Sequence, residues 1–176
     1  MPTILTHAVV PLTLGAAAGR RVISRRLLAA GAIAAMLPDA DVLAFKLHVA
    51  YADNFGHRGA THSIAFALLL GLAAFIGLQR WESTPWRSAV FVGWAALSHP
   101  LLDACTDGGL GVALWWPFSN TRWFAPLHPI AVSPIGARFL SERGWQVLVS
   151  EFCWVWVPTA IVAACIVAWQ RTSKRT

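Results

Sequence analysis

Charged side chains are scarce in this 176-residue chain. Asp, Glu, Lys and Arg together make up 12% of it, whereas a soluble domain averages about 25%. Hydrophobic residues make up 57%, so too few charges remain to cover a soluble surface and the composition predicts a membrane protein. Ten tryptophans agree with this, because Trp is enriched at the membrane–water boundary. The length predicts a single membrane-embedded domain over residues 1–176.

Several common signatures are missing. The three cysteines, Cys105, Cys153 and Cys165, form no Cys-x-x-Cys pair, which argues against a disulfide framework or a zinc ribbon; the last two are expected to be small core residues. The sequence has no Gly-x-Ser-x-Gly motif and no phosphate-binding Gly-rich loop, so it does not predict a serine hydrolase or a nucleotide-binding fold. No basic residues precede the first apolar run, and we expect no cleavable signal peptide.

Apolar runs predict the architecture. There are five of them: Ile4–Gly19, Leu27–Leu37, Ser63–Gln79, Ser88–Leu102 and Phe152–Trp169. Several are shorter than the roughly 20 residues that a full membrane span needs, and the second would need extension by flanking residues. The sequence therefore predicts an all-α, polytopic membrane helical bundle of about five short transmembrane or embedded helices.

Basic residues predict the orientation. The net charge is +6, and the basic residues gather at Arg20–Arg26, at Arg80–Arg87 and at the C-terminus. The positive-inside rule assigns these groups to the cytoplasm, with nine of the fourteen Lys and Arg residues. The stretches Pro38–His62 and Asp103–Ser150 then lie outside. This spacing fits topology better than a phosphate-tracking stripe, so no nucleic-acid partner is expected.

Two motifs at outer helix ends predict metal ligands. In SHPLLD (98–103), His99 and Asp103 are four residues apart on one helix face, which suits chelation of a divalent metal. A plain hydrogen bond between them is the alternative. In LPDADV (37–42), one of Asp39 and Asp41 would bind the metal and the other would act on water or on a second metal. The alternative for Asp39 is a helix cap.

The stretch HRGATHS (57–63) predicts further site residues. Thr61 or Ser63 would cap the third helix, and His62 would be a metal ligand. Arg58 suits bidentate binding of a phosphate, unless it anchors at the interface or pairs with Asp53. His57 could be an exposed loop histidine.

Two more residues complete the candidate site. His7 is a polar residue in an apolar helix and needs a partner, which could also be backbone. Arg122, in the aromatic stretch 106–130, is a second candidate anion-binding residue. The predicted metal ligands are thus His7, Asp39, Asp41, His62, His99 and Asp103. Three imidazoles and three carboxylates suit one or two zinc ions, with manganese or iron as alternatives.

These motifs resemble the YdjM-type family. The resemblance rests on His7, PDAD (38–41), RGATHS (58–63), SHPLLD with Thr106, and WWPF (115–118), and it covers residues 7–118. Members are described as inner-membrane-associated metal-dependent hydrolases, and some as binding the repressor LexA. The resemblance implies a bacterial inner-membrane protein. With the two arginines as anion binders, the predicted substrate-binding set is His57, Arg58, Thr106 and Arg122.

The ligand order is also similar to that of zinc-dependent phospholipases C. By that resemblance, one metal would take Asp39 or Asp41 with His62, His99 and Asp103, and a second would take His7 and share Asp103. The chain departs from those enzymes in beginning Met-Pro rather than with a ligating Trp. It also lacks their later His and His-x-x-x-Glu set, so one or two metals are expected rather than three.

Three functions follow as hypotheses. The first is a membrane-bound hydrolase that cleaves a phosphoester of a lipid or lipid-linked substrate at the outer membrane boundary. There, a metal would activate water, Asp39 or Asp41 would accept the proton, and Arg58 would hold the phosphate. The second is a membrane-anchored regulatory protein of the LexA-binding type with a structural metal. The third, a transporter, is disfavoured because the ligands lie at segment ends rather than near the bilayer midplane.

Overall fold

The computed structural model describes residues 1–77, 81–134 and 139–173. Throughout these residues the regular elements are helices, with two isolated bridges and no β-strand. The predicted all-α class is therefore confirmed. The elements are α1 (Ile4–Ala18), α2 (Arg25–Met36), the 3₁₀ helix η1 (Leu37–Val42), α3 (Leu43–Lys46), the 3₁₀ helix η2 (Ala60–His62), α4 (Ile64–Ile76), α5 (Pro85–Ala104), α6 (Glu142–Glu151), the π-helix η4 (Phe152–Trp156) and α7 (Val157–Thr172).

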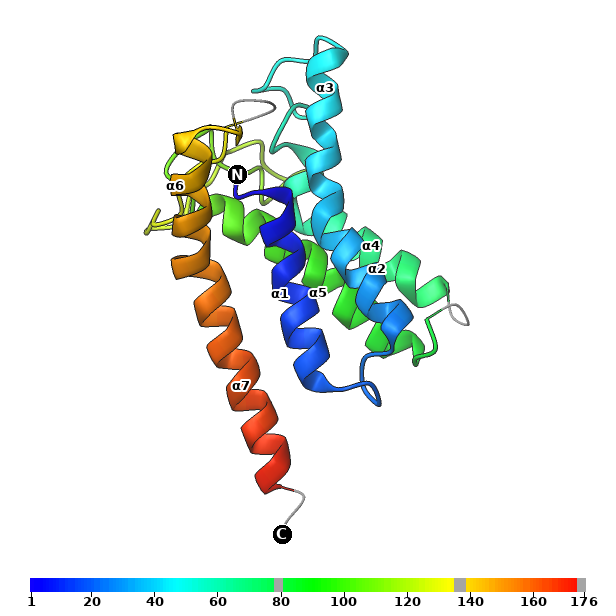
Figure 1. Cartoon of the computed structure of the whole chain (residues 1–176). Coiled ribbons are helices and arrows are strands. Elements are labelled where there is room, and N and C mark those ends of the chain that lie inside the picture. The colour runs from blue at the N-terminus through cyan, green and yellow to red at the C-terminus, as the bar shows by residue number, and fades with distance from the viewer. Residues whose placement is uncertain (78–80, 135–138, 174–176) are drawn as a thin grey trace.

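The helices form a bundle in which α5 packs against α2 and α4, and α1 packs against α2 and α7 (Figure 1). The elements α2, η1 and α3 follow one another as a continuous helical rod, and so do α6, η4 and α7. The long connections gather at the end of the bundle where the N-terminus lies. The α1–α2 and α4–α5 connections lie toward the opposite end (Figure 1), where Arg26 forms an ion pair with Glu82.

Side-chain caps explain where the helices begin. Thr3, Ser24, Ser63 and Thr84 each occupy the N-cap, and each accepts a hydrogen bond from a backbone N–H of the first turn. Such caps satisfy N–H groups that have no partner within the helix. Of the two residues predicted to cap the third segment, Ser63 does so.

Two predicted segments differ in length from the helices. The second continues through η1 and α3 to Lys46, with Pro38 in the first turn of η1. The fifth begins at Glu142 rather than at Phe152. The residues of α6 are too polar to form an apolar run, so the sequence pattern did not indicate this helix. Gln79, at the end of the third segment, lies outside the described residues.

Small residues let the helices approach closely. Phe91 of α5 fills the space that Gly15 and Gly31 leave: a Cβ at Gly31 would lie 2.3 Å from the Phe91 ring. Ala34 and Ala96 belong to the same buried cluster as Phe91. Glycine and alanine at these positions are typical of membrane helices, whose association depends on close packing.

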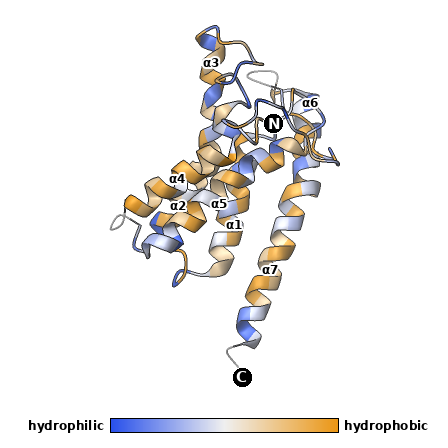
Figure 2. Ribbon diagram, turned by 180° about the vertical axis from the view of Figure 1, so that it is seen from behind, coloured by the Kyte–Doolittle hydropathy of each residue, from blue (hydrophilic) through white to orange (hydrophobic). Residues whose placement is uncertain are grey.

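The outside of the bundle is apolar. Large side chains such as Leu68 and Ile76 on α4 and Ile161 on α7 are more than half exposed, and apolar residues cover α4 and the middle of α7 (Figure 2). By length and composition, two rods could cross a membrane: Arg25–Lys46 and Glu142–Thr172. The second is largely exposed, unlike the core helix of a soluble protein. Cys153 and Cys165 lie on this exposed surface, so the prediction that they are core residues was wrong.

We expect Gly31→Ala to destabilise the bundle, because the added methyl group overlaps the Phe91 ring. Overpacking of this kind costs about 1–3 kcal/mol. Thermal unfolding in detergent would measure it. Gly93→Ala is the matched control, since its Cβ would lie no closer than 3.5 Å to any neighbour. Combining Gly31→Ala with Phe91→Leu should recover part of the loss; equal unfolding temperatures for Gly31→Ala and Gly93→Ala would contradict this account.

Candidate metal centre

Five buried ionisable side chains converge at the end of the bundle that carries the long connections. His7 comes from the first turns of α1, Asp39 from η1, His62 from the end of η2, and His99 and Asp103 from the last two turns of α5. Their exposures are all 3% or less. These five residues, all predicted as metal ligands, therefore lie together in the fold. Asp39 accepts no capping hydrogen bond, so the alternative of a helix cap was wrong.

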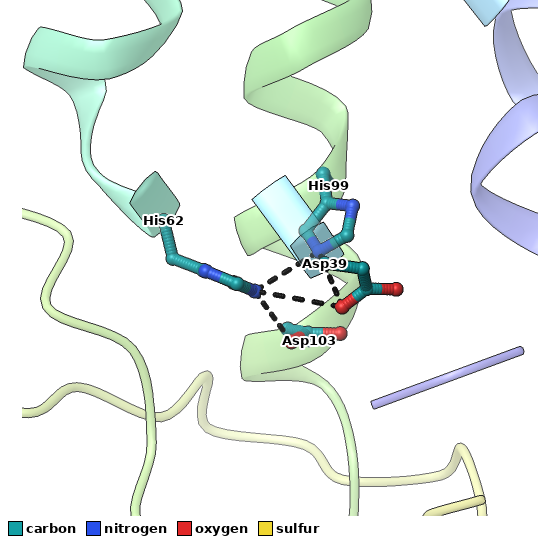
Figure 3. A group of neighbouring side chains, drawn as sticks. All are labelled: Asp39, His62, His99 and Asp103. Atoms are coloured by element: carbon teal, nitrogen blue, oxygen red, sulfur yellow. Dashed lines mark hydrogen bonds and ion pairs between the residues drawn. The ribbon is translucent and has the colours of Figure 1, made fainter. Parts of the chain in front are cut away.

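Four of these residues point at a common centre (Figure 3). His62 Nε2 lies 3.0 Å from His99 Nε2, 3.3 Å from Asp103 Oδ2 and 3.9 Å from Asp39 Oδ1. His99 Nε2 lies 3.4 Å from Asp39 Oδ1. Ligand atoms at about 2.0–2.1 Å from a tetrahedral zinc would be about 3.3 Å apart. The spacing of the four atoms therefore fits one metal ion.

Hydrogen bonds on the far sides of the imidazoles determine which nitrogens face the centre. His99 Nδ1 lies 2.6 Å from the carbonyl oxygen of Ala35, which can only accept, so Nδ1 donates. His62 Nδ1 lies 3.1 Å from Asp41 Oδ2 and donates to that carboxylate. Each neutral ring then directs its Nε2 lone pair at the other, 3.0 Å away. Two lone pairs at this distance repel each other unless a metal ion or a proton lies between them.

Unpaired polar atoms support the same conclusion. Among the described residues, eight buried side-chain polar atoms have no hydrogen-bond partner, and six of them belong to His7, Asp39 and Asp103. A seventh, Arg58 Nε, is ion-paired with Asp103 Oδ2 at 3.1 Å. Because buried polar atoms are normally hydrogen-bonded, such a cluster indicates that these atoms bind a further partner. Imidazole and carboxylate together are a donor set suited to zinc or to manganese and iron.

His7 lies on the other side of the two carboxylates. Its ring stacks on His99 with centroids 3.6 Å apart. Its Nε2 is 3.4 Å from Asp103 Oδ1 and 4.0 Å from Asp39 Oδ2, the oxygens that face away from His62. Neither ring nitrogen has a hydrogen-bond partner, so the alternative of a core histidine bonded to backbone was wrong. His7 thus lies next to both carboxylates, outside the group of four residues that could hold one ion.

Asp41 and His57 form a layer behind His62. Asp41 Oδ1 lies 2.5 Å from His57 Nδ1, and Oδ2 accepts from the Arg58 backbone N–H and the Thr61 hydroxyl as well as from His62. With His62, these two residues also form a group in reach of one ion. Their atoms already have partners, and 2.5 Å suits a hydrogen bond, so we interpret Asp41 as the residue that orients His62. His57 is 2% exposed, so the alternative of an exposed loop histidine was wrong.

Arg58 is fully buried and does not pair with Asp53. Its Nη1 donates to the Gly108 carbonyl at 2.8 Å and its Nη2 to the Thr106 hydroxyl at 2.9 Å, while Nε pairs with Asp103. Thr106 in turn donates to the Asp103 carbonyl. In this structure Arg58 and Thr106 therefore hold Asp103 in place. Their predicted contact with a substrate stays a prediction.

Gly109 was missed by reasoning from the sequence. Its φ is +90°, and a Cβ there would lie 2.7 Å from both Arg58 Nη1 and the Tyr51 hydroxyl. Only glycine adopts this backbone readily and leaves space for the guanidinium. The GGLG stretch at 108–111 gave a weak signal, because it matches no phosphate-loop motif.

Arg122 holds a neighbouring loop. Its guanidinium donates to the carbonyl oxygens of Tyr51, Asp53 and His57. It thereby fixes the loop that leads into HRGATHS, and its predicted role in anion binding stays a prediction. Phe118, in the same outer stretch, is 93% exposed, as expected of an aromatic side chain at a membrane boundary.

His62 favours its protonated form. Burial alone lowers the pKa of His62, but hydrogen bonds to Asp103 and Asp41 outweigh it and raise the pKa to about 9. A proton on His62 would then relieve the contact with His99 when no metal is bound. A metal ion has to displace that proton, so acid weakens metal binding.

The fold and the site define a class: a helical bundle with an apolar exterior and a buried His/Asp cluster that could bind a metal ion. The chain belongs to the YdjM inner membrane protein family, whose model matches residues 1–175. It is 47% identical over 173 residues to inner membrane protein YbcI of Escherichia coli (strain K12), which covers 97% of this chain and 99% of that protein. No solved structure matches it significantly. The resemblance found in the motifs is thus confirmed, and the inner membrane is the location that these matches support.

We expect purified protein to retain a divalent metal that His99→Ala and Asp103→Ala both lose, because each change removes one ligand of the same cluster. Elemental mass spectrometry on detergent-purified protein would measure the metal content. His128→Ala is the control, since His128 is exposed and makes an edge-to-face contact with Phe124 instead. Wild-type protein that binds no metal, even after incubation with zinc or manganese, would contradict the assignment.

Proposed function

We propose that this protein is a membrane-embedded, metal-dependent hydrolase that cleaves a phosphoester of a lipid or lipid-linked substrate at the outer face of the inner membrane. The observation that carries the proposal is the set of unpaired ligand atoms on His7, Asp39 and Asp103 beside His62 and His99. A purely structural metal would be enclosed by its ligands. Here more ligand atoms converge than one structural ion needs.

The donor set fits two ions. Asp39 Oδ1, His62 Nε2, His99 Nε2 and Asp103 Oδ2 would hold the first, and His7 Nε2, Asp39 Oδ2 and Asp103 Oδ1 would contribute to the second. When bound, such ions polarise a phosphoryl oxygen and lower the pKa of a water ligand. Zinc is our first choice, with manganese or iron as alternatives.

The residues of the chain would orient and hold this centre. Asp41 fixes the tautomer of His62, the Ala35 carbonyl fixes that of His99, and Arg58 fixes the Asp103 carboxylate. In the hydrolysis, the water oxygen forms a bond to phosphorus, the ester P–O bond breaks, and a proton reaches the leaving oxygen. We propose that water and substrate reach the centre from the side of Asp39, because Asp39 lines a cavity.

A cavity of about 310 Å³ supports that route and the lipid substrate class. Asp39 lines it, together with apolar side chains that include Ile4, Leu5, Val42 and Phe139. A cavity with one carboxylate and apolar walls suits an amphiphile, whose phosphate would approach the metal while its apolar part stays on the walls.

The basic residues support the orientation. Arg21, Arg26 and Arg87 lie near one another around the α1–α2 and α4–α5 connections, at the end of the bundle opposite the metal centre (Figure 1). With the positive-inside rule, this arrangement favours a multi-pass protein whose site faces the periplasm. The alternative of a LexA-binding protein would need a cytoplasmic surface, and α1 and α2 are joined there by only residues 19–24.

We expect the metal-loaded protein to release phosphate or a phosphorylated headgroup from at least one lipid in a panel of phosphatidic acid, phosphatidylglycerol, phosphatidylethanolamine and undecaprenyl diphosphate. Asp39→Asn should lower turnover at least 100-fold, because it removes a charged ligand from the centre. Mixed micelles with phosphate and mass-spectrometric detection would measure it. Glu82→Gln, at the far end, is the control. Fully metallated protein that cleaves none of these lipids would contradict the hydrolase.

We expect a cysteine at position 118 to react with a membrane-impermeant maleimide in intact spheroplasts, and a cysteine at position 82 to react only after permeabilisation. Phe118→Cys and Glu82→Cys would be made in a variant without Cys105, Cys153 and Cys165. Phe118 and Glu82 are both exposed and lie at opposite ends of the bundle. Reaction in the reverse order would place the metal centre on the cytoplasmic side and favour the regulatory alternative.

A further inference from the structure

Glu151 is a buried carboxylate outside the metal centre. It is 0% exposed and ends α6, just before the π-helix η4. A carboxylate at this depth, in a rod that continues as the apolar α7, is costly unless it has partners. Its partners lie across the bundle, in the first turn of α1.

Three groups of α1 bind this carboxylate. The Thr3 hydroxyl donates to Glu151 Oε2 at 2.7 Å, the Thr6 hydroxyl donates to the same oxygen at 2.6 Å, and the Thr3 backbone N–H donates to Oε1. Thr3 is also the N-cap of α1, and the first turn of α1 contains no acidic residue. Glu151 belongs to a helix that is distant in the sequence but adjacent in space. It thus supplies the negative charge that stabilises the N-terminus of α1.

The π-helix adds a fourth contact. Trp156 Nε1 donates to the Thr6 hydroxyl at 2.8 Å, which directs the Thr6 proton toward Glu151. Residues five apart on an α-helix point in different directions, whereas the wider turn of a π-helix brings them to nearly the same face. The π-helical turn over Phe152–Trp156 therefore lets Glu151 and Trp156 hold the same threonine.

His7 follows Thr6 directly, and it is the candidate ligand whose nitrogens make no hydrogen bond of their own. Unlike His62 and His99, it has no hydrogen-bonded partner behind its ring. Its position therefore depends on its own helix turn and on stacking against His99. We propose that Glu151 is a positioning residue for His7: with Trp156, it holds the first turn of α1 so that His7 Nε2 faces Asp39 and Asp103.

The inference rests on the proposed function, in which His7 is the ligand specific to the second ion. Glu151→Gln should then weaken the second ion more than tenfold and leave the first ion unchanged, since residues behind a ligand typically contribute 10- to 100-fold to metal affinity. Zinc titration followed by elemental analysis would measure the two affinities. Glu142→Gln is the matched control, because Glu142 is exposed on the same rod and is also acidic.

A second measurement does not depend on metal. In metal-free protein, hydrogen–deuterium exchange of the first turns of α1 should be faster in Glu151→Gln than in wild type, with α5 unchanged. Thr6→Val, which removes one donor and keeps the shape of the side chain, should shift both measurements in the same direction and serves if Glu151→Gln does not fold.

The outcomes separate the two proposals. Two ions bound with wild-type affinities by Glu151→Gln, or unchanged exchange in α1, would overturn the role of Glu151 and leave the hydrolase standing. A wild-type protein that binds a single ion would overturn the link from Glu151 to a second ion. A wild-type protein that binds no metal ion would overturn the proposed function itself. Faster hydrogen–deuterium exchange of α1 in Glu151→Gln would then still support the role of Glu151 in holding the first turn of α1.

Discussion

The structure depends on the burial of two carboxylates, Asp39 and Asp103, inside an apolar bundle. An isolated ionised carboxylate in such surroundings is highly unfavourable. Three imidazoles and the Arg58 guanidinium surround the pair, yet all four carboxylate oxygens lack a hydrogen bond. A metal ion would supply the positive charge that the two carboxylates still lack. Such an ion would also explain why so many polar side chains gather in one place.

Each helix end contributes to that centre through a different local structural feature. The 3₁₀ turn after α2 brings Asp39 inward, the Ser63 cap ends η2 just after His62, and the last two turns of α5 present His99 and Asp103 together. Around them a second layer, formed by Ala35, Asp41, Thr106 and Arg58, fixes ring tautomers and carboxylate orientation. Such supporting contacts restrict the ligand atoms to positions that fit a small ion.

The exterior obeys a different constraint. Lipid contact allows large apolar side chains to stay exposed on α4 and α7, and close helix contacts are left to Gly15, Gly31 and small neighbours of Phe91. Membership of an inner-membrane family agrees with this surface. The rod that contains α7 also carries Glu151, whose polar contacts with α1 connect the outermost helix to the metal centre.

The sequence by itself determined the helical membrane class, the approximate helices and the main candidate ligands. Apolar runs, basic groups and the i, i+4 pair of His99 and Asp103 are local patterns, and local patterns can be recognised in the sequence without a structure. Tertiary structure alone decided that Asp39 faces the centre while Asp41 supports His62. It also decided that Arg58 and Arg122 bind the protein's own carbonyl and carboxylate groups. Only the structure shows that Gly109 leaves space for Arg58 and that Glu151 binds Thr3 and Thr6. These assignments depend on contacts between residues far apart in the chain, which have no fixed spacing and therefore no motif to reveal them.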